Sequence, residues 1–203
     1  DLYAGPTTVE VDREEITVVG PIPEPELPEG AGDPERDAAD DNSDIQLMDI
    51  ATHLSRQCRY NGATLRPYSV AEHSVFVYAT VESMPGSTRN DRAWALMHDA
   101  AEAYIGDIIS PVKNLLGDRI FQIESAFEEA IARRFGLEGP IPECVRTADR
   151  IALHCEMEHL LAGPRVGHTG DPWAGIPTVK PPQLSNGGRD MFLHLADELL
   201  LPD

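Results

Sequence analysis

The chain has 203 residues but only two lysines, Lys113 and Lys180, beside 14 arginines and 35 acidic side chains. Its formal net charge is −19. Proteins bind duplex nucleic acid largely by neutralising its phosphates with basic side chains. The scarcity of positive charge therefore excludes duplex nucleic acid as an expected partner.

Cysteines and long apolar runs are also scarce. The three cysteines, Cys58, Cys144 and Cys155, form no C-x-x-C pair, so they predict free thiols in a reducing compartment rather than a zinc finger. No stretch of 18 apolar residues occurs, which predicts no transmembrane helix and no membrane partner. The acidic N-terminal end lacks a hydrophobic targeting core, and we expect a cytoplasmic protein without a signal peptide.

The negative charge is concentrated at the N-terminal end. Residues 1–44 contain 14 acidic and two basic side chains, together with six prolines. This composition disfavours a compact fold. We interpret residues 1–43 as an acidic Pro-rich extension or linker, with β-like pieces that could form a short ribbon. The composition favours a solvated extension, and a partner-binding arm is the alternative.

Residues 44–203 have the patterns of one all-α domain with six or seven helices, in which apolar residues recur at helical spacing. Ser69 followed by Glu72 predicts a capping box. Ser110 followed by proline predicts the N-cap of another helix. Further helices are expected over residues 94–104, 118–135, 142–161 and 187–201, with a long Pro- and Gly-rich loop over 164–186.

The helix expected over residues 94–104 is Ala-rich and apolar but carries three ionisable side chains. His98 and Asp99 are adjacent, and Glu102 follows one turn after His98. Uncompensated charge in a core is costly, so these groups need a partner, and a metal ion is the candidate. His73 and Asp149, on two other expected helices, can supply further ligands in a helical bundle.

Two imidazoles and two carboxylates make a mixed nitrogen and oxygen donor set. Such a set suits Mn, Fe, Co, Ni or Zn better than Ca, and without a thiolate it is not a structural zinc site. Four ligands leave positions for water and substrate on a five- or six-coordinate ion. The donor set therefore predicts a hydrolytic centre, in which a metal polarises a phosphoryl oxygen and lowers the pKa of a water.

The order of these residues resembles the HD-domain metal-dependent phosphohydrolases, and within them the 5′-deoxynucleotidases and the phage dATP triphosphohydrolases. The resemblance covers about residues 44–163 and implies an HD-domain helical bundle. It is carried by four motifs in family order, namely Glu72-His73-Ser74, His98-Asp99-Ala-Ala-Glu102, Gly106-Asp107-Ile-Ile-Ser110-Pro111-Val112-Lys113 and Ala148-Asp149.

The resemblance also implies roles for the matching residues. The implied metal ligands are His73, His98, Asp99 and Asp149. Glu102 would handle the attacking water or its proton, so Glu102 and Asp99 are the expected catalytic residues. Contacts with the sugar and phosphates of a nucleotide are implied for Arg59, Tyr60, Asp107, Ser110 and Lys113. The family often has a tryptophan where this chain has Tyr60.

Lys113 is also singled out by its position. It lies in the first turn of the helix that starts at Ser110, where backbone N–H groups and the helix dipole favour an anion such as phosphate. A surface lysine without a ligand is the alternative.

The expected activity is hydrolysis of (deoxy)nucleoside 5′-phosphates at the α-phosphorus, releasing a (deoxy)nucleoside plus phosphate or triphosphate, with Mg as an optional ion on the phosphates. One alternative is a dNTP triphosphohydrolase specifically. Others are a non-catalytic metal or nucleotide sensor and a protein whose metal only joins helices. The apolar stripe of the helix over 118–135 is either core or a subunit interface, and a homo-oligomer is expected.

Overall fold

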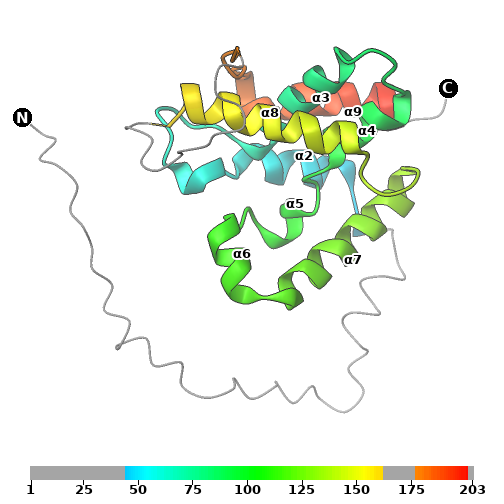
Figure 1. Cartoon of the computed structure of the whole chain (residues 1–203). Helices are drawn as coiled ribbons and strands as arrows, with labels where there is room; N and C mark the ends of the chain where they lie inside the picture. Colours follow the sequence, from blue (N-terminus) through cyan, green and yellow to red (C-terminus); the bar gives the residue numbers. More distant parts are fainter. Residues whose placement is uncertain (1–43, 162–176, 201–203) are drawn as a thin grey trace, which may run out of the picture. The chain divides into compact units, whose positions relative to one another are not determined.

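The computed structural model describes residues 44–161 and 177–200, and every regular element in these ranges is a helix (Figure 1). Within these ranges the backbone forms only two isolated β-bridges, Cys58 with Ser69 and Thr64 with Leu161. The all-α class is therefore confirmed for this part of the chain. None of the helices described there is both long and apolar enough to span a membrane. The extension at 1–43 and most of the loop expected at 164–186 lie outside the described residues.

Helix α3, Val70–Glu82, is buried on almost all of its faces. Apolar residues lie on several of its sides, as is typical of a central helix, and ten of its 13 residues are buried, including Glu72, His73 and Ser74. It packs against α2 (Leu47–Arg56), α4 (Arg89–Met97), α8 (Glu143–His159) and α9 (Arg189–Leu200). This central place lets side chains from several helices meet near the start of α3.

The predicted capping box is confirmed at the start of α3. The Ser69 hydroxyl accepts the Glu72 backbone N–H at 3.0 Å, and the Glu72 carboxylate accepts the Ser69 N–H at 3.0 Å. The buried Glu72 carboxylate also accepts the Arg66 guanidinium at 3.1 Å and the Leu184 N–H at 3.0 Å. The first turn of α3 is therefore held by the segment just before it and by a segment that is distant in the chain.

The helix expected over residues 94–104 is interrupted. Helix α4 ends at Met97, and α5 (Glu102–Ile105) begins four residues after His98. In the turn between them the Glu102 N–H bonds to Asp99 O at 3.0 Å, three residues back rather than four. Such 3₁₀ winding aligns side chains that are three residues apart. The backbone after Met97 is therefore wound more tightly than the regular helix expected over 94–104.

Helices α6 (Ser110–Leu116) and α7 (Asp118–Phe135) lie to one side of the helices around α3 (Figure 1). The N-cap of α6 is Ile109, so the prediction of Ser110 as the N-cap is wrong. The N–H groups of Val112 and Lys113 both bond to Ile109 O, at 2.9 and 3.1 Å. Both N–H groups are therefore bonded within the first turn of α6, and the anion contact expected at this helix start stays a prediction.

Helix α7 matches the helix expected over residues 118–135 and ends at Gly136, which has a left-handed conformation with φ of 68°. Ile120 and Ile131 on its apolar stripe are buried. The ring of Phe127 stacks on that of Tyr104, with centroids 5.3 Å apart. The stripe therefore packs on this chain itself, as the core interpretation predicts. The expectation of a homo-oligomer remains a prediction.

Helices α8 and α9 agree with the helices expected over 142–161 and 187–201 to within two residues at each end. A short 3₁₀ helix, η3 (Ser185–Gly188), precedes α9 and packs against the start of α3. The Ser69 hydroxyl donates to Gly187 O at 2.7 Å. Gly187 has φ of 58°, and a Cβ there would overlap the carbonyl oxygen of Ser55. This close approach therefore requires glycine.

Candidate metal centre

The four side chains expected as metal ligands lie together between α3, α4 and α8. The Nε2 atoms of His73 and His98 are 3.3 Å apart. Asp149 Oδ1 lies 3.1 Å from His73 Nε2. Asp99 Oδ2 lies 3.3 Å from His98 Nε2 and 3.5 Å from His73 Nε2. Residues from α3, from the turn that follows α4 and from α8 thus present two imidazole nitrogens and two carboxylate oxygens to one another.

These separations fit the ligands of one ion. Two ligand atoms about 2.1 Å from an ion, at angles of roughly 90° to 110°, are about 3.0–3.4 Å apart. His73, His98 and Asp149 each offer a ligand atom, and these atoms all lie within 4.8 Å of one another. The three residues therefore form a group that could hold a metal ion, and Asp99 Oδ2 lies within 3.5 Å of both imidazoles of that group.

The group is closed on one side and open on the other. The His73 side chain has no exposed surface, whereas the side chain of Asp99 is 22% exposed and that of Asp149 is 42% exposed. Solvent therefore reaches the group from the side of the two carboxylates. A catalytic metal site needs such an open side for water and substrate, whereas a structural site is closed by its protein ligands.

Both imidazoles direct Nε2 into the group because Nδ1 is bonded elsewhere. His98 Nδ1 lies 2.9 Å from Ala95 O, a carbonyl that can only accept a hydrogen bond. His73 Nδ1 lies 2.6 Å from Glu156 Oε1. Nδ1 is therefore the nitrogen that donates in each ring, which leaves Nε2 as the ligand atom.

The charges of the group stabilise one another. Burial opposes protonation of His98, but Asp99 outweighs burial and raises the pKa of His98 to about 9. Burial opposes ionisation of Asp99, but His98 and His73 hold the pKa of Asp99 well below its usual range. Burial also opposes ionisation of Asp149, yet the bond from His73 lowers the pKa of Asp149. Both carboxylates are therefore ionised at neutral pH, as metal binding requires.

Glu156, on α8, is a member of the site that the sequence motifs do not identify. Its side chain has no exposed surface, and its Oε1 lies 2.6 Å from His73 Nδ1. Burial opposes ionisation of this carboxylate, but His73 and then Arg59 favour it, so the pKa of Glu156 is lowered to about 2. The available signal is spacing: Glu156 follows Asp149 by seven residues, which places both on one face of α8.

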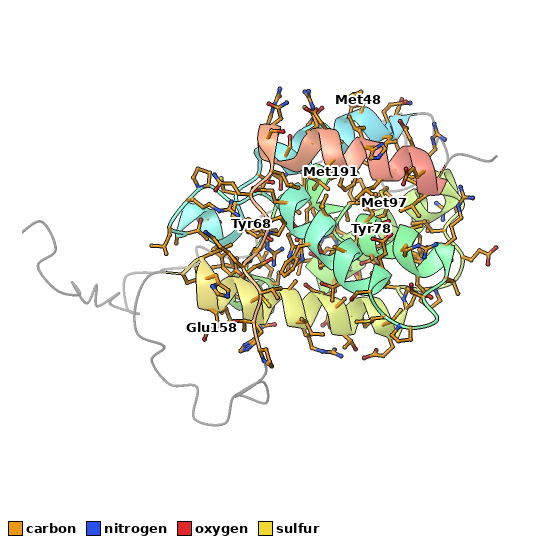
Figure 2. The ribbon with its side chains drawn as sticks, turned by 90° about the horizontal axis from the view of Figure 1, so that it is seen from above. Met48, Tyr68, Tyr78, Met97, Glu158 and Met191 are labelled. Atoms are coloured by element: carbon orange, nitrogen blue, oxygen red, sulfur yellow. The ribbon has the colours of Figure 1, made fainter. Side chains whose placement is uncertain are left out.

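Tyr68 supports Glu156 from the segment before α3. It lies beside the end of α8 that carries Glu158 (Figure 2), is fully buried, and donates its hydroxyl to Glu156 Oε1 at 3.0 Å. Burial and the Glu156 carboxylate raise the pKa of Tyr68. The hydroxyl therefore stays protonated and acts as a donor.

Arg59 and Tyr60, expected at the phosphate and sugar of a nucleotide, contact carboxylates of the site. Arg59 Nη1 lies 3.3 Å from Asp99 Oδ2, and Arg59 Nε lies 3.3 Å from Glu156 Oε2. The Tyr60 hydroxyl donates to Glu156 Oε2 at 2.7 Å. Both residues belong to the 3₁₀ helix η2 (Arg59–Gly62), in which Tyr60 has φ of 57°. The structure thus brings both residues to the candidate metal centre.

Glu102 is a buried acid next to the ligand pair. The residue is 7% exposed, and no hydrogen-bond partner for its Oε2 occurs within the described part of the chain. Burial, and after it Asp99 and Asp107, raise the pKa of Glu102 to about 9. A carboxyl whose pKa is raised toward or above neutrality and which has a free oxygen is suited to receive or deliver a proton.

The other residues expected around the substrate come from the α5–α6 segment. Lys113 Nζ lies 2.6 Å from Glu124 Oε1 and 4.0 Å from Glu102 Oε1. The Asp107 N–H donates to Gln57 Oε1 at 3.1 Å, and burial raises the pKa of the half-buried Asp107 carboxyl. Ser110 is the first residue of α6, and its side chain lies outside the described atoms.

Comparison with known proteins finds two kinds of similarity. Residues 1–56 match the family described as "Rv1265-like protein, N-terminal domain". A part of the chain is 36% identical over 124 residues to an uncharacterized protein of Rhodobacter capsulatus, covering 58% of this chain and 63% of that protein. A part is 38% identical over 117 residues to the uncharacterized protein YfdR of Escherichia coli, covering 58% of this chain and 62% of YfdR. The chain thus spans less than two thirds of the length of these relatives.

Proposed function

We propose that this chain is a metal-dependent phosphohydrolase of the HD-domain type, which cleaves (deoxy)nucleoside 5′-phosphates at the α-phosphorus. The products are a (deoxy)nucleoside plus phosphate, or plus triphosphate from a triphosphate substrate. The observation that carries the proposal is the meeting of two imidazole Nε2 atoms with Asp99 and Asp149. Glu102, three residues after Asp99, adds a buried acid whose Oε2 has no hydrogen-bond partner among the described residues.

The donor set supports a transition metal. Neutral imidazole and carboxylate ligands suit Mn, Co, Zn, Fe or Ni, and Mg remains an option on the phosphates of the substrate. When bound, the metal supplies a Lewis acid for a phosphoryl oxygen and a water of lowered pKa. The exposed side at Asp99 and Asp149 supports an open site over a metal that only joins helices.

Glu102 manages the proton in this proposal. Its raised pKa, about 9, results from burial and from the neighbouring Asp99 and Asp107. Positive charge brought near Asp99 by a metal favours ionisation of Glu102, because an opposite charge stabilises a carboxylate. Glu102 can then accept a proton from water and pass it to the leaving oxygen.

Arg59 and Lys113 offset the negative charge of the phosphoryl oxygens. Arg59 is held by Asp99 and Glu156, each at 3.3 Å. Lys113 is held by Glu124 at 2.6 Å. Because these carboxylates already fix the two cations, a phosphate loses less side-chain entropy when it binds them.

The test is a screen of chelator-treated protein against NMPs, dNMPs, NTPs and dNTPs with Mn, Co, Zn or Mg, in which the products are separated. We expect release of a nucleoside by the unchanged protein and none above background by Asp99→Ala. Asp197→Ala, at an exposed position on α9, is the matched control and should keep the full rate.

The outcomes separate the candidate functions. Triphosphate among the products would narrow the proposal to a dNTP triphosphohydrolase. Binding of a nucleotide and a metal without turnover of any substrate would instead indicate a non-catalytic sensor and would refute the proposed phosphohydrolase activity.

A further inference from the structure

Glu156 uses all of its acceptor capacity inside the protein. Oε1 accepts from His73 Nδ1 at 2.6 Å and from the Tyr68 hydroxyl at 3.0 Å. Oε2 accepts from the Tyr60 hydroxyl at 2.7 Å and from Arg59 Nε at 3.3 Å. The carboxylate has about four lone-pair sites, so its four donors match what it can accept.

This arrangement is not the least costly way to fill the space. The Glu156 side chain has no exposed surface, and apolar residues of similar volume often replace buried ion pairs with no loss of stability. A stability argument alone therefore does not explain the residue. The explanation must lie in what the carboxylate does to the groups that it bonds.

Two of those groups act on the candidate metal centre. An ionised carboxylate can only accept hydrogen bonds, so the His73 nitrogen that faces Glu156 carries the proton. The other nitrogen, Nε2, is then held toward Asp149 at 3.1 Å. Arg59 is held by Glu156 at one end of its guanidinium while its Nη1 reaches Asp99 at 3.3 Å.

We propose that Glu156 is a positioning residue for the metal centre, which orients His73 through Nδ1 and holds Arg59 against the ligand Asp99. Tyr68 and Tyr60 fix the carboxylate itself. Removal of a carboxylate that accepts the hydrogen bond of a metal-ligating histidine typically weakens metal binding by about 10–100-fold. The inference rests on the metal site of the proposed function but not on the reaction.

Two substitutions separate the two roles. Glu156→Gln retains one carbonyl oxygen, which can accept from His73 and Tyr68, but it places an amide N–H₂ donor opposite the donor Arg59 Nε. Glu156→Leu removes every acceptor. Glu143→Gln is the matched control because Glu143 lies on the same helix with a side chain that is 72% exposed.

The first measurement is the affinity of each chelator-treated variant for Zn²⁺, by competition with a chromophoric chelator. We expect Zn²⁺ to bind about 10–100-fold more weakly to Glu156→Leu, and at most a few-fold more weakly to Glu156→Gln. Glu143→Gln should bind like the unchanged protein. Unchanged Zn²⁺ affinity in a folded Glu156→Leu variant would overturn the proposal.

The second measurement is the His73 Nδ1–H resonance in a ¹⁵N-correlated spectrum of the Zn²⁺-loaded unchanged protein. This measurement needs no variant, so it is independent of whether a variant folds. We expect a slowly exchanging Nδ1–H proton with Nε2 on the metal. An Nε2–H proton, with Nδ1 on the metal, would overturn the proposal. The Glu156→Gln variant should retain the Nδ1–H resonance.

If Glu156→Leu does not fold, Tyr68→Phe provides the comparison. It removes one buried hydrogen-bond donor to Glu156. The control, Tyr78→Phe, removes a donor whose hydrogen bond to Glu82 is 2.7 Å long and does not involve the residues of the metal centre. Weaker Zn²⁺ binding by Tyr68→Phe alone supports the proposal, and equal binding by the two variants contradicts it.

The two proposals fail in different ways. Failure of the unchanged protein to bind any of Mn, Co and Zn would refute both the positioning role and the metal-dependent function. Zn²⁺ binding that depends on Glu156, without hydrolysis of any nucleotide, would support the inference and refute the phosphohydrolase.

Discussion

Lys113 Nζ lies 4.0 Å from Glu102 Oε1, and the same ammonium group contacts Glu124 Oε1 at 2.6 Å. One cation of α6 therefore lies between an acid of α5 and an acid of α7. The Lys113 side chain is 21% exposed, so part of it remains available to a ligand. Lys113 acts on Glu102 as well, because a nearby positive charge lowers the pKa of a carboxyl group.

Substitution of Lys113 by methionine should reduce kcat/KM for the best nucleotide substrate by about tenfold or more, since in the proposed reaction it removes a positive charge that would stabilise phosphoryl oxygens. A raised KM with an unchanged kcat would mean that Lys113 binds the phosphate equally in the substrate and the transition state. A lowered kcat would mean that Lys113 stabilises the transition state or tunes the proton transfer of Glu102. The measurement is steady-state hydrolysis with the preferred metal.

Lys180→Met is the control for that prediction, because Lys180 is the other lysine of the chain and is exposed. It should leave both kinetic parameters unchanged. Equal activity of the Lys113→Met and unchanged proteins would remove Lys113 from the substrate site and leave it as a structural partner of Glu124.

Glu102 should make the metal-free protein less stable as the pH rises. Its pKa in the folded state is raised to about 9, first by burial and then by Asp99 and Asp107, whereas an unfolded glutamate titrates near about 4.3. Between these values the folded state keeps a proton that the unfolded state releases. The contribution of Glu102 to the free energy of unfolding is therefore fully present below about pH 4 and is lost as the pH rises through about 9.

Glu102→Gln removes this titration. The free energy of unfolding of the variant minus that of the unchanged protein should be larger at pH 8 than at pH 5 by about 1 kcal/mol or more. Urea denaturation of chelator-treated protein at the two pH values measures the gain. Glu143→Gln, which removes an exposed acid paired with Arg150 at 2.9 Å, should show no comparable change. A gain that is the same at pH 5 and pH 8 would argue against a buried protonated Glu102.

Local signals predicted the helix class and much of the candidate site. The capping box of Ser69 and Glu72 involves groups three residues apart, so sequence order alone indicates it. His98 and Asp99 are adjacent, and their charge within an apolar stretch predicts a partner. The structure places the two further expected ligands, His73 and Asp149, 3.1 Å from each other, and His73 Nε2 lies 3.3 Å from His98 Nε2.

Other features depend on packing between distant segments and left no local signal. The backbone after Met97 tightens into turns with hydrogen bonds three residues back, which the apolar spacing does not indicate. Glu124 meets Lys113 across two helices. The seven-residue spacing from Asp149 to Glu156 places both on one face of α8, but only the packing of α8 against α3 brings Glu156 to His73.

The close packing of η3 on α2 should not tolerate a side chain at Gly187. This residue has φ of 58°, and a Cβ would overlap the carbonyl oxygen of Ser55. Gly139 has φ of 68°, but nothing lies within 4 Å of the Cβ position there. Gly139→Ala therefore measures the cost of the left-handed backbone alone, about 1 kcal/mol, and Gly187→Ala adds the clash.

We expect Gly187→Ala to lower the free energy of unfolding by about 2 kcal/mol or more beyond Gly139→Ala, since overpacking of well-packed backbone costs about 1–3 kcal/mol. Urea denaturation at neutral pH measures both variants. The displacement should also weaken the bond from the Ser69 hydroxyl to Gly187 O, which lies at the N-cap of the helix that carries His73. Equal stability of the two variants would mean that η3 moves away from Ser55 at no cost, and that the start of α3 does not depend on this contact.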